Sequence, residues 1–495
     1  MKRVTALLLA LLVVLGSTSA ARADGIDVKV KGEWDFAFGW ADKTVFPNSV
    51  HFNASDRDDD SFIARQRIRT QVNFITSEYL QGVLMFEIGD IDWGRAEGNS
   101  GPGSGGALDA DGVNIETKLA YLDWLIPSTE VSVRMGIQSL VLPSTPLGTP
   151  VLDADVAGVV ISSPVTDWLS VTALWARPFD HNYNDGNRHY NDEVDIFGLL
   201  LPVEGEGWKL TPWGLYGFLG ANSGVYDFIF ADEYDNTVDV ENSHTKAWWV
   251  GAHLELTLLE PLVFNVEGIY GRMNRVDLGR NFFAGYGFDP AMEERVRASG
   301  WFVAATLDYE LDWGTPGIFA WWSSGDDKDA DQDGKIGRLL PLSVDNAGFA
   351  PTSFGSAGTY SIGTDSLVTA SGLGSWGVGI QLADFSFVED LAHTLRFAYY
   401  RGTNDAELIK KTGEVNFLKY RHDGLYLTDE DSVFEVNFDH TYQIYENLTA
   451  VVELGYLRLN ADADTWRNKN NLAGRTDLSE HKNAWKAQLM FQYSF

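Results

Sequence analysis

The chain has 495 residues, and 70 acidic against 37 basic side chains give it a formal net charge of −33. This acidic excess argues against a nucleic-acid-binding protein, because little in the chain would neutralise a phosphate backbone. A sequence without cysteine excludes disulfides, thiolate metal sites and cysteine nucleophiles. A hydrophobic content of 45% excludes a disordered chain, so the chain must fold and its apolar residues must be covered.

The N-terminus predicts export. A short basic start, Met1-Lys2-Arg3, precedes an apolar run over 7–15 and the small-residue site Ala21-Arg22-Ala23. This order is typical of a secretory signal peptide, which we expect to be cleaved after Ala23. The apolar run is shorter than the roughly 20 residues that a membrane-spanning helix needs, which argues against an uncleaved anchor. Residues 1–23 are thus predicted as a signal peptide and 24–495 as one mature domain.

Beyond the signal peptide, apolar and polar side chains alternate with a period of two. Val30, Trp34 and Phe36 share one parity, whereas Lys29 and Lys31 share the other. This period predicts strands with one apolar and one polar face. Eighteen such strands are predicted, over 26–40, 61–75, 80–92, 114–125, 130–139, 156–162, 168–177, 193–202, 207–219, 245–257, 262–272, 297–310, 313–323, 374–385, 391–402, 432–443, 447–459 and 483–495.

The connections between these strands alternate between short and long. Those after the even-numbered strands are short, as at 76–79 and 126–129, and those after the odd-numbered strands are long and rich in Asp, Asn and Gly. This sorting is typical of an up-and-down transmembrane barrel with periplasmic turns and extracellular loops. We therefore predict an all-β antiparallel barrel of about eighteen strands around an aqueous lumen. Sixteen strands remain the alternative if 156–162 and 313–323 are loop.

The last predicted strand ends at an aromatic residue, Phe495. Trp485, Leu489 and Tyr493 fall on one face of it, and Lys486 falls on the other. A terminal aromatic residue resembles the signature that outer-membrane barrels present to their assembly machinery. Together with the export signal, this predicts the outer membrane of a Gram-negative bacterium.

Several short segments carry a family resemblance. They are 64–69 (Ala-Arg-Gln-Arg-Ile-Arg), 86–90 (Phe-Glu-Ile-Gly-Asp), 155–158 (Asp-Val-Ala-Gly), 322–327 (Trp-Ser-Ser-Gly-Asp-Asp) and 381–384 (Gln-Leu-Ala-Asp). On these segments the chain resembles the homotrimeric outer-membrane porins of sulfate-reducing bacteria. The resemblance implies a trimer of separate pores that pass small hydrophilic solutes and ions by passive diffusion. A substrate-specific channel of the same architecture is the alternative.

Basic residues gather at lumen parity on the first strands. Arg65, Arg67 and Arg69 lie two residues apart, so all three point to one face of the second predicted strand. Neighbouring strands add basic residues at the same parity, namely Lys29, Lys31, Lys118 and Arg134. Like charges this close need counter-charge or water. We interpret the set as one wall of the pore constriction, the alternative being a solvated wall without a special role.

The third loop, about Val141 to Asp155, is the expected opposite wall. It contains Pro143, Pro146 and Pro150 and ends with Asp153 and Asp155. Proline stiffens a loop, which suits a segment packed inside a pore. General porins pair a basic wall with such an acidic, inward-folded third loop.

An acidic loop predicts a calcium site. Asp329, Asp331 and Asp333, followed by Gly334, match the first half of a calcium-binding loop, in which the Lys335 carbonyl would be a ligand. Leu340 stands where the bidentate glutamate of such a loop belongs. A solvated acidic loop without bound calcium is the alternative. The acidic loops as a group would also suit bridges to lipopolysaccharide through divalent ions.

Aromatic residues gather near the ends of the predicted strands. Trp40, Trp248, Trp485 and Tyr493 fall on the lipid-facing parity near strand ends, where aromatic residues form interfacial girdles. A slide of stacked aromatic residues for sugars is the alternative, but it would need lumen parity. Signatures of metalloproteases, phosphate-binding loops and serine hydrolases are missing from the sequence, so we do not expect an enzyme. A barrel enzyme and a structural barrel are the rival classes.

Overall fold

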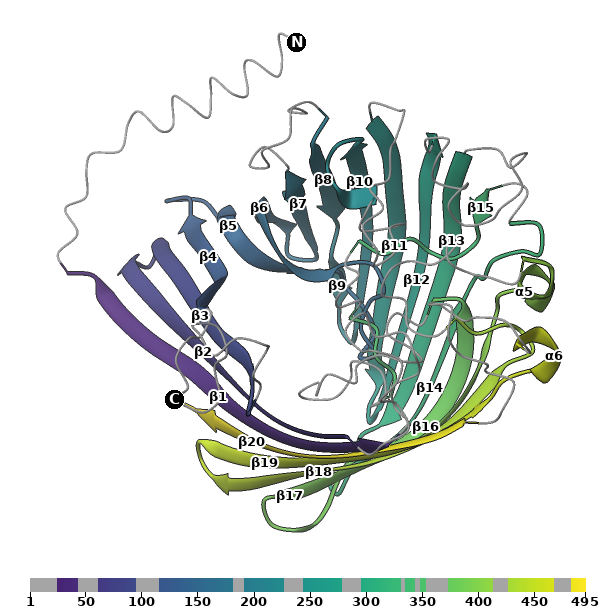
Figure 1. Ribbon diagram of the computed structural model, residues 1–495. Helices are drawn as coiled ribbons and strands as arrows, with labels where there is room; N and C mark the ends of the chain where they lie inside the picture. The colour runs from purple at the N-terminus through teal and green to yellow at the C-terminus, as the bar shows by residue number, and fades with distance from the viewer. Residues whose placement is uncertain are drawn as a thin grey trace.

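The computed structural model describes residues 25–42, 61–94, 115–180, 191–226, 244–277, 295–330, 334–342, 348–352, 373–412, 426–466 and 482–495. Within these residues, eighteen antiparallel strands form one closed ring (Figure 1). The ring closes where β1 pairs with β20, Trp34 lying opposite Tyr493. In Figure 1 the purple β1 lies beside the yellow β20.

The strands follow one another around the ring in chain order. They are β1 (Asp27–Asp42), β2 (Ser61–Ser77), β3 (Leu80–Asp92), β4 (Ile115–Leu125), β5 (Ser132–Val141), β6 (Asp153–Thr166), β7 (Leu169–Asp180), β8 (Glu193–Leu200), β10 (Trp208–Gly220), β11 (His244–Leu259), β12 (Leu262–Asp277), β13 (Arg295–Tyr309), β14 (Thr315–Ser323), β16 (Ser375–Val388), β17 (Leu391–Gly402), β18 (Ser432–Tyr445), β19 (Leu448–Asn460) and β20 (Lys482–Ser494). Two short strands, β9 (Val203–Gly205) and β15 (Lys335–Ile336), lie outside the ring.

The predicted fold class is confirmed. Each of the eighteen predicted segments overlaps a strand of the ring, and the two weakest, 156–162 and 313–323, coincide with β6 and β14. Both pair with neighbours on two sides, so the ring has eighteen strands and not sixteen. The third connection is shorter than predicted, because Asp153 and Asp155 already belong to β6.

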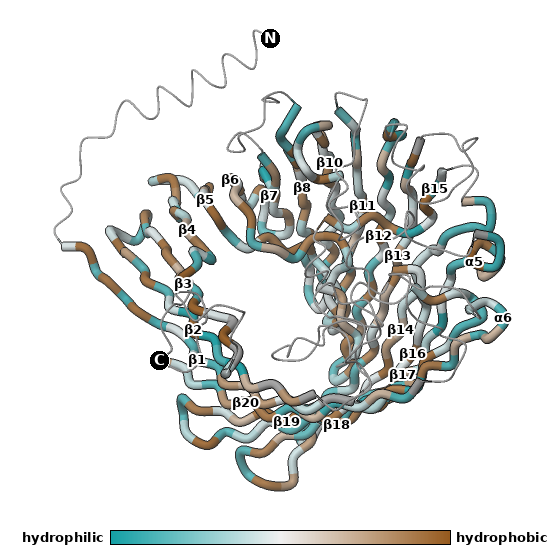
Figure 2. The backbone as a smooth tube through the Cα atoms, in the orientation of Figure 1, coloured by the Kyte–Doolittle hydropathy of each residue, from teal (hydrophilic) through white to brown (hydrophobic). Residues whose placement is uncertain are grey.

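The two faces of the strands differ in character, as alternation requires. On β12, Asn265, Glu267 and Ile269 are buried on the inner face, while Val266 and Tyr270 on the opposite face are only partly covered. On the outer face, large apolar side chains such as Trp40 and Trp485 are exposed. Figure 2 shows the resulting alternation of polar and apolar residues along the strands.

The two ends of the ring differ in their connections. At one end, here called the short-turn end, two residues join β2 to β3, β16 to β17 and β18 to β19. At the opposite, long-loop end, the structure describes the short helices α5 (Ala406–Thr412) and α6 (Ala463–Trp466), which lie side by side in Figure 1. Among the described residues, no helix is long and apolar enough to cross a membrane.

Two connecting segments pack against the inner side of the strands. We call 142–152 the first inner segment, and 334–342 together with 348–352 the second inner segment. Leu142 and Val151 of the first are buried, as are Leu339 and Phe349 of the second. They belong to the same hydrophobic cluster as inner side chains of β10–β14, such as Trp249. The cluster extends along the ring from Leu140 of β5 to Ala484 of β20, so the apolar core borders most of the strands.

Candidate pore lining

A chain of alternating charges crosses the inner wall on β1–β6. Arg69 on β2 lies between two carboxylates, its Nε 2.6 Å from Glu87 on β3 and its Nη1 3.2 Å from Glu33 on β1. Lys118 on β4 lies 4.0 Å from Glu87 and 2.7 Å from Asp155 on β6. Each charge in this chain thus has a partner of opposite sign.

The other arginines of β2 continue this wall. Arg67 lies 3.6 Å from Asp35 on β1, whose side chain is only 2% exposed. Arg65 faces the same way two residues earlier and is in register with Asp92 of β3. Carboxylates from β1 and β3 thus lie beside Arg67 and Arg69, and the role of the three arginines as a wall of the constriction stays a prediction.

The structure separates Arg134 from this row. Its Nε and Nη2 lie 2.6 and 2.9 Å from the two oxygens of Asp123 on β4, a bidentate pair. Asp123 is in register with Gln81 of β3, six positions from Glu87, which corresponds to about 20 Å along the strand. Arg134 therefore belongs to a different level of the lumen than Arg69.

Two predicted wall residues lie at the short-turn end. Lys29 and Lys31 are exposed near the start of β1, and Lys29 lies 3.9 Å from Asp27. Asp27 is in register with Ile75, next to the turn between β2 and β3. Of the nine residues predicted for the constriction, the ion pairs join Arg69, Lys118 and Asp155 into one network.

The first inner segment reaches across the barrel to β12. The hydroxyl of Thr145 donates a hydrogen bond of 3.3 Å to Oε1 of Glu267, which is 1% exposed. Within the segment, the Leu142 N–H donates to the Leu152 carbonyl at 3.1 Å and closes its base. The segment is therefore fixed at both its base and its tip.

Sequence reasoning missed the second inner segment. Trp249 of β11 donates from its indole nitrogen to the Leu340 carbonyl at 2.8 Å, and the Phe349 ring lies 4.8 Å from that of Phe302 on β13. Its signal was present in the sequence, because the apolar residues Ile336, Leu339, Leu340 and Leu342 directly follow the acidic segment 326–333. The N–H groups of 342 and 350 donate to carbonyls at 151 and 147, so the two inner segments form one unit.

The predicted calcium site is only partly within the described residues. Asp329 is exposed, and Lys335 lies in β15, in register with Arg297 of β13, whereas Asp331 and Asp333 fall outside the described ranges. In the part of the chain that the structure describes, no group of three His, Asp or Glu residues could hold a metal ion. Calcium binding stays a prediction.

A buried ion pair organises the long-loop end instead. Asp326, next to the predicted calcium loop, lies 3.0 Å from Arg338, and both side chains are almost fully buried. Tyr426 donates its hydroxyl to the same carboxylate at 3.1 Å. Burial, together with the charge of Asp326, raises the pKa of Tyr426 well above its ordinary value. The Asp326 carboxylate therefore connects the segments that carry Arg338 and Tyr426.

The predicted girdle residues lie on the outer face. Trp40, Trp485 and Tyr493 are each more than a third exposed, and Trp248 is partly covered. The first three come from β1 and β20, the strands that close the ring. Their exposure fits a surface that contacts lipid and not water.

A closed ring of this size, apolar outside and charged inside, is the architecture of outer-membrane porins. The crystal structure of OccK2 (OpdF) from Pseudomonas aeruginosa in complex with glucuronate is 13% identical, with a TM-score of 0.50 over 95% of this chain and 98% of that chain. A double variant of OccD1 (OprD) is 12% identical, with a TM-score of 0.50 over 96% and 97%. At such identities the likeness establishes the fold. No protein-family model matches the chain, and neither does a curated protein sequence.

Proposed function

We propose that this protein forms a water-filled channel through the outer membrane of a Gram-negative bacterium, through which small hydrophilic solutes and ions diffuse passively. The observation that carries the proposal is the closed ring with exposed aromatic side chains outside and ion pairs inside. A bilayer accepts only backbones whose hydrogen bonds are internally satisfied, as in a closed barrel. An eighteen-stranded barrel is wide enough to keep an aqueous lumen.

The finer proposal concerns the constriction. The wall that carries Arg65, Arg67 and Arg69 and the first inner segment would together limit the size and charge of passing solutes. The support is the Thr145–Glu267 contact, which holds the segment away from β5 and β6. Because carboxylates accompany the arginines, we expect a strong local field between opposite charges and only a weak overall preference for anions.

A substrate-specific channel of the same architecture is the second candidate. It is favoured by the likeness to OccK2, which was crystallised with glucuronate. A specific channel would transport its substrate with saturation, whereas a general porin would show rates that fall smoothly with solute size.

The remaining partners follow from the sequence. We propose that residues 1–23 are removed on export, that Phe495 is presented to the barrel assembly machinery, and that the mature protein is a homotrimer. Lipid and lipopolysaccharide would surround it, and the acidic loop at 329–335 would take up calcium weakly.

Swelling of liposomes tests the proposed function. Vesicles that contain the purified protein, diluted into isotonic solutions of sugars of increasing size, should swell at rates that decrease with size. Vesicles with heat-denatured protein serve as the control. If the native protein leaves vesicles as impermeable as that control, it is not a channel.

A further inference from the structure

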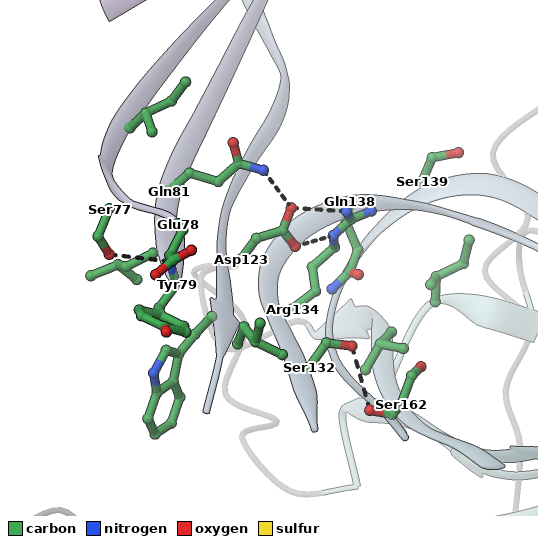
Figure 3. Close-up of a pocket in the computed structure, with 16 residues that line it drawn as sticks. Ser77, Glu78, Tyr79, Gln81, Asp123, Ser132, Arg134, Gln138, Ser139 and Ser162 are labelled. Atoms are coloured by element: carbon green, nitrogen blue, oxygen red, sulfur yellow. Dashed lines mark hydrogen bonds and ion pairs between the residues drawn. The ribbon is translucent and has the colours of Figure 1, made fainter. Parts of the chain in front are cut away.

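A cavity of about 610 Å³ lies on the inner wall at the short-turn end, between β2 and β6 (Figure 3). Ser77 and Glu78 at the turn between β2 and β3 line its edge. Its further polar groups come from Gln81, Asp123, Ser132, Arg134, Gln138, Ser139 and Ser162. The apolar lining is made of aliphatic side chains and of the aromatic Tyr79 and Trp124. This volume is within the roughly 300–1,000 Å³ of small-molecule sites.

The lining of this cavity carries no surplus positive charge. Figure 3 shows Asp123 between Arg134 and Gln81, and both of its oxygens accept hydrogen bonds, two from Arg134 and one of 3.2 Å from Gln81. The guanidinium also lies 4.4 Å from the centre of the Tyr121 ring. Glu78 adds a further carboxylate, so the lining holds two acids and one base. A small organic anion would therefore find no surplus positive charge there.

The remaining polar groups suit hydroxylated solutes. The Ser162 and Thr172 hydroxyls lie 2.9 Å apart, and the Ser132 hydroxyl donates to the Ser162 carbonyl at 3.4 Å. The amide of Gln138 is 1% exposed and is fixed by donation to the Gly158 carbonyl at 3.0 Å. Hydroxyls and amides both donate and accept, as sugar hydroxyls do, and the aliphatic side chains match the C–H faces of a sugar ring.

Resting on the proposed channel function, we propose that this cavity is a subsite for neutral polyhydroxylated solutes, such as sugars and polyols. It binds them by hydrogen bonds to Ser132, Gln81 and the Asp123–Arg134 pair. It disfavours organic anions of the same size, because the Arg134 guanidinium is already paired with the Asp123 carboxylate.

Single-channel recordings in planar bilayers, with glucose and gluconate as matched probes, test the subsite. Glucose should reduce the ion current through the wild-type channel with saturation, and gluconate should not. Ser132→Trp places an indole in the cavity and should weaken the glucose block about tenfold, the equivalent of roughly 1.4 kcal/mol. The control is Thr441→Trp, which adds the same bulk at an exposed position of β18 and should keep the block.

A charge variant makes the test sharper. Asp123→Asn keeps the size of the side chain but frees the guanidinium of its counter-charge, so gluconate should now block the current. Equilibrium dialysis of labelled glucose against the detergent-solubilised protein gives a readout that needs no conduction. Equal block by glucose and gluconate in the wild type, or unchanged glucose binding in Ser132→Trp, would overturn the subsite. Loss of conductance in every protein, with glucose binding intact, would instead overturn the channel function.

Discussion

Thr145 and Glu267 are 122 residues apart in the chain, yet the threonine hydroxyl donates a hydrogen bond to the carboxylate at 3.3 Å. Thr145 lies in the connection between β5 and β6, and Glu267 lies on β12, further around the ring. The two side chains are 2% and 1% exposed, so they form a buried contact. This contact fixes the position of the first inner segment within the barrel.

Removing this contact should loosen the inner segment. Thr145→Val keeps the shape of the side chain but removes the hydroxyl donor to a buried carboxylate, at a cost of about 1–3 kcal/mol. We expect a larger and noisier single-channel conductance, because the segment would leave the wall more often. Thr441→Val, at an exposed position on β18, is the control. Identical conductance and noise in Thr145→Val and the wild type would contradict this role.

The arginine row should control ion preference. Replacing Arg65, Arg67 and Arg69 together with serine leaves Glu33 and Glu87 without their shared arginine, so the wall becomes acidic. We expect a wider pore and a shift of the reversal potential toward cation selectivity in a salt gradient. A reversal potential equal to that of the wild type would show that this wall does not set selectivity.

The buried pair at the long-loop end should stabilise the barrel. Asp326→Ala removes the buried carboxylate that pairs with Arg338, and breaking a buried ion pair typically costs about 3–5 kcal/mol. The adjacent Asp327 is exposed, and Asp327→Ala should change stability by no more than about 0.5 kcal/mol. Thermal unfolding followed by circular dichroism compares them, and equal unfolding temperatures would argue against a structural role of the pair.

Closure of the ring should depend on Gly32. Its N–H donates to the Phe495 carbonyl at 2.8 Å, and a Cβ at this position would lie 2.6 Å from the Phe495 ring and clash with the Arg69 carbonyl. Gly32→Val should therefore lower the fraction of folded barrel, measured by the mobility of unheated protein on SDS gels. Gly268→Val on β12 meets open space and is the control. Equal folded fractions would contradict this prediction.

Chelation tests the calcium prediction. If Asp329, Asp331 and Asp333 bind calcium with a Kd of about 10⁻⁴–10⁻³ M, EDTA should lower the unfolding temperature and make the loop more sensitive to protease. Asp331→Asn should abolish both effects of EDTA. If EDTA changes neither property of the wild type, the segment is only a solvated acidic loop.

The alternation of apolar and polar side chains was enough to predict the barrel. It was enough even at 156–162, the weak predicted segment that lies within β6. Alternation reports which way a side chain faces, and for that reason Arg65, Arg67 and Arg69 could be assigned to one wall. It does not report register, so the pairing of Arg69 with both Glu33 and Glu87 could not be foreseen. Contacts such as Thr145–Glu267 depend on how a loop folds over distant strands, which no local pattern records.

The central claim is an open aqueous pore through a closed ring, and single-channel current in planar bilayers measures it most directly. Purified protein added to a bilayer in symmetric salt should give stepwise, ohmic currents without any added ligand. Their size should fall in proportion to the conductivity of the bulk solution as salt is diluted. A protein that inserts without current steps, or conducts only when a solute is added, would contradict the account.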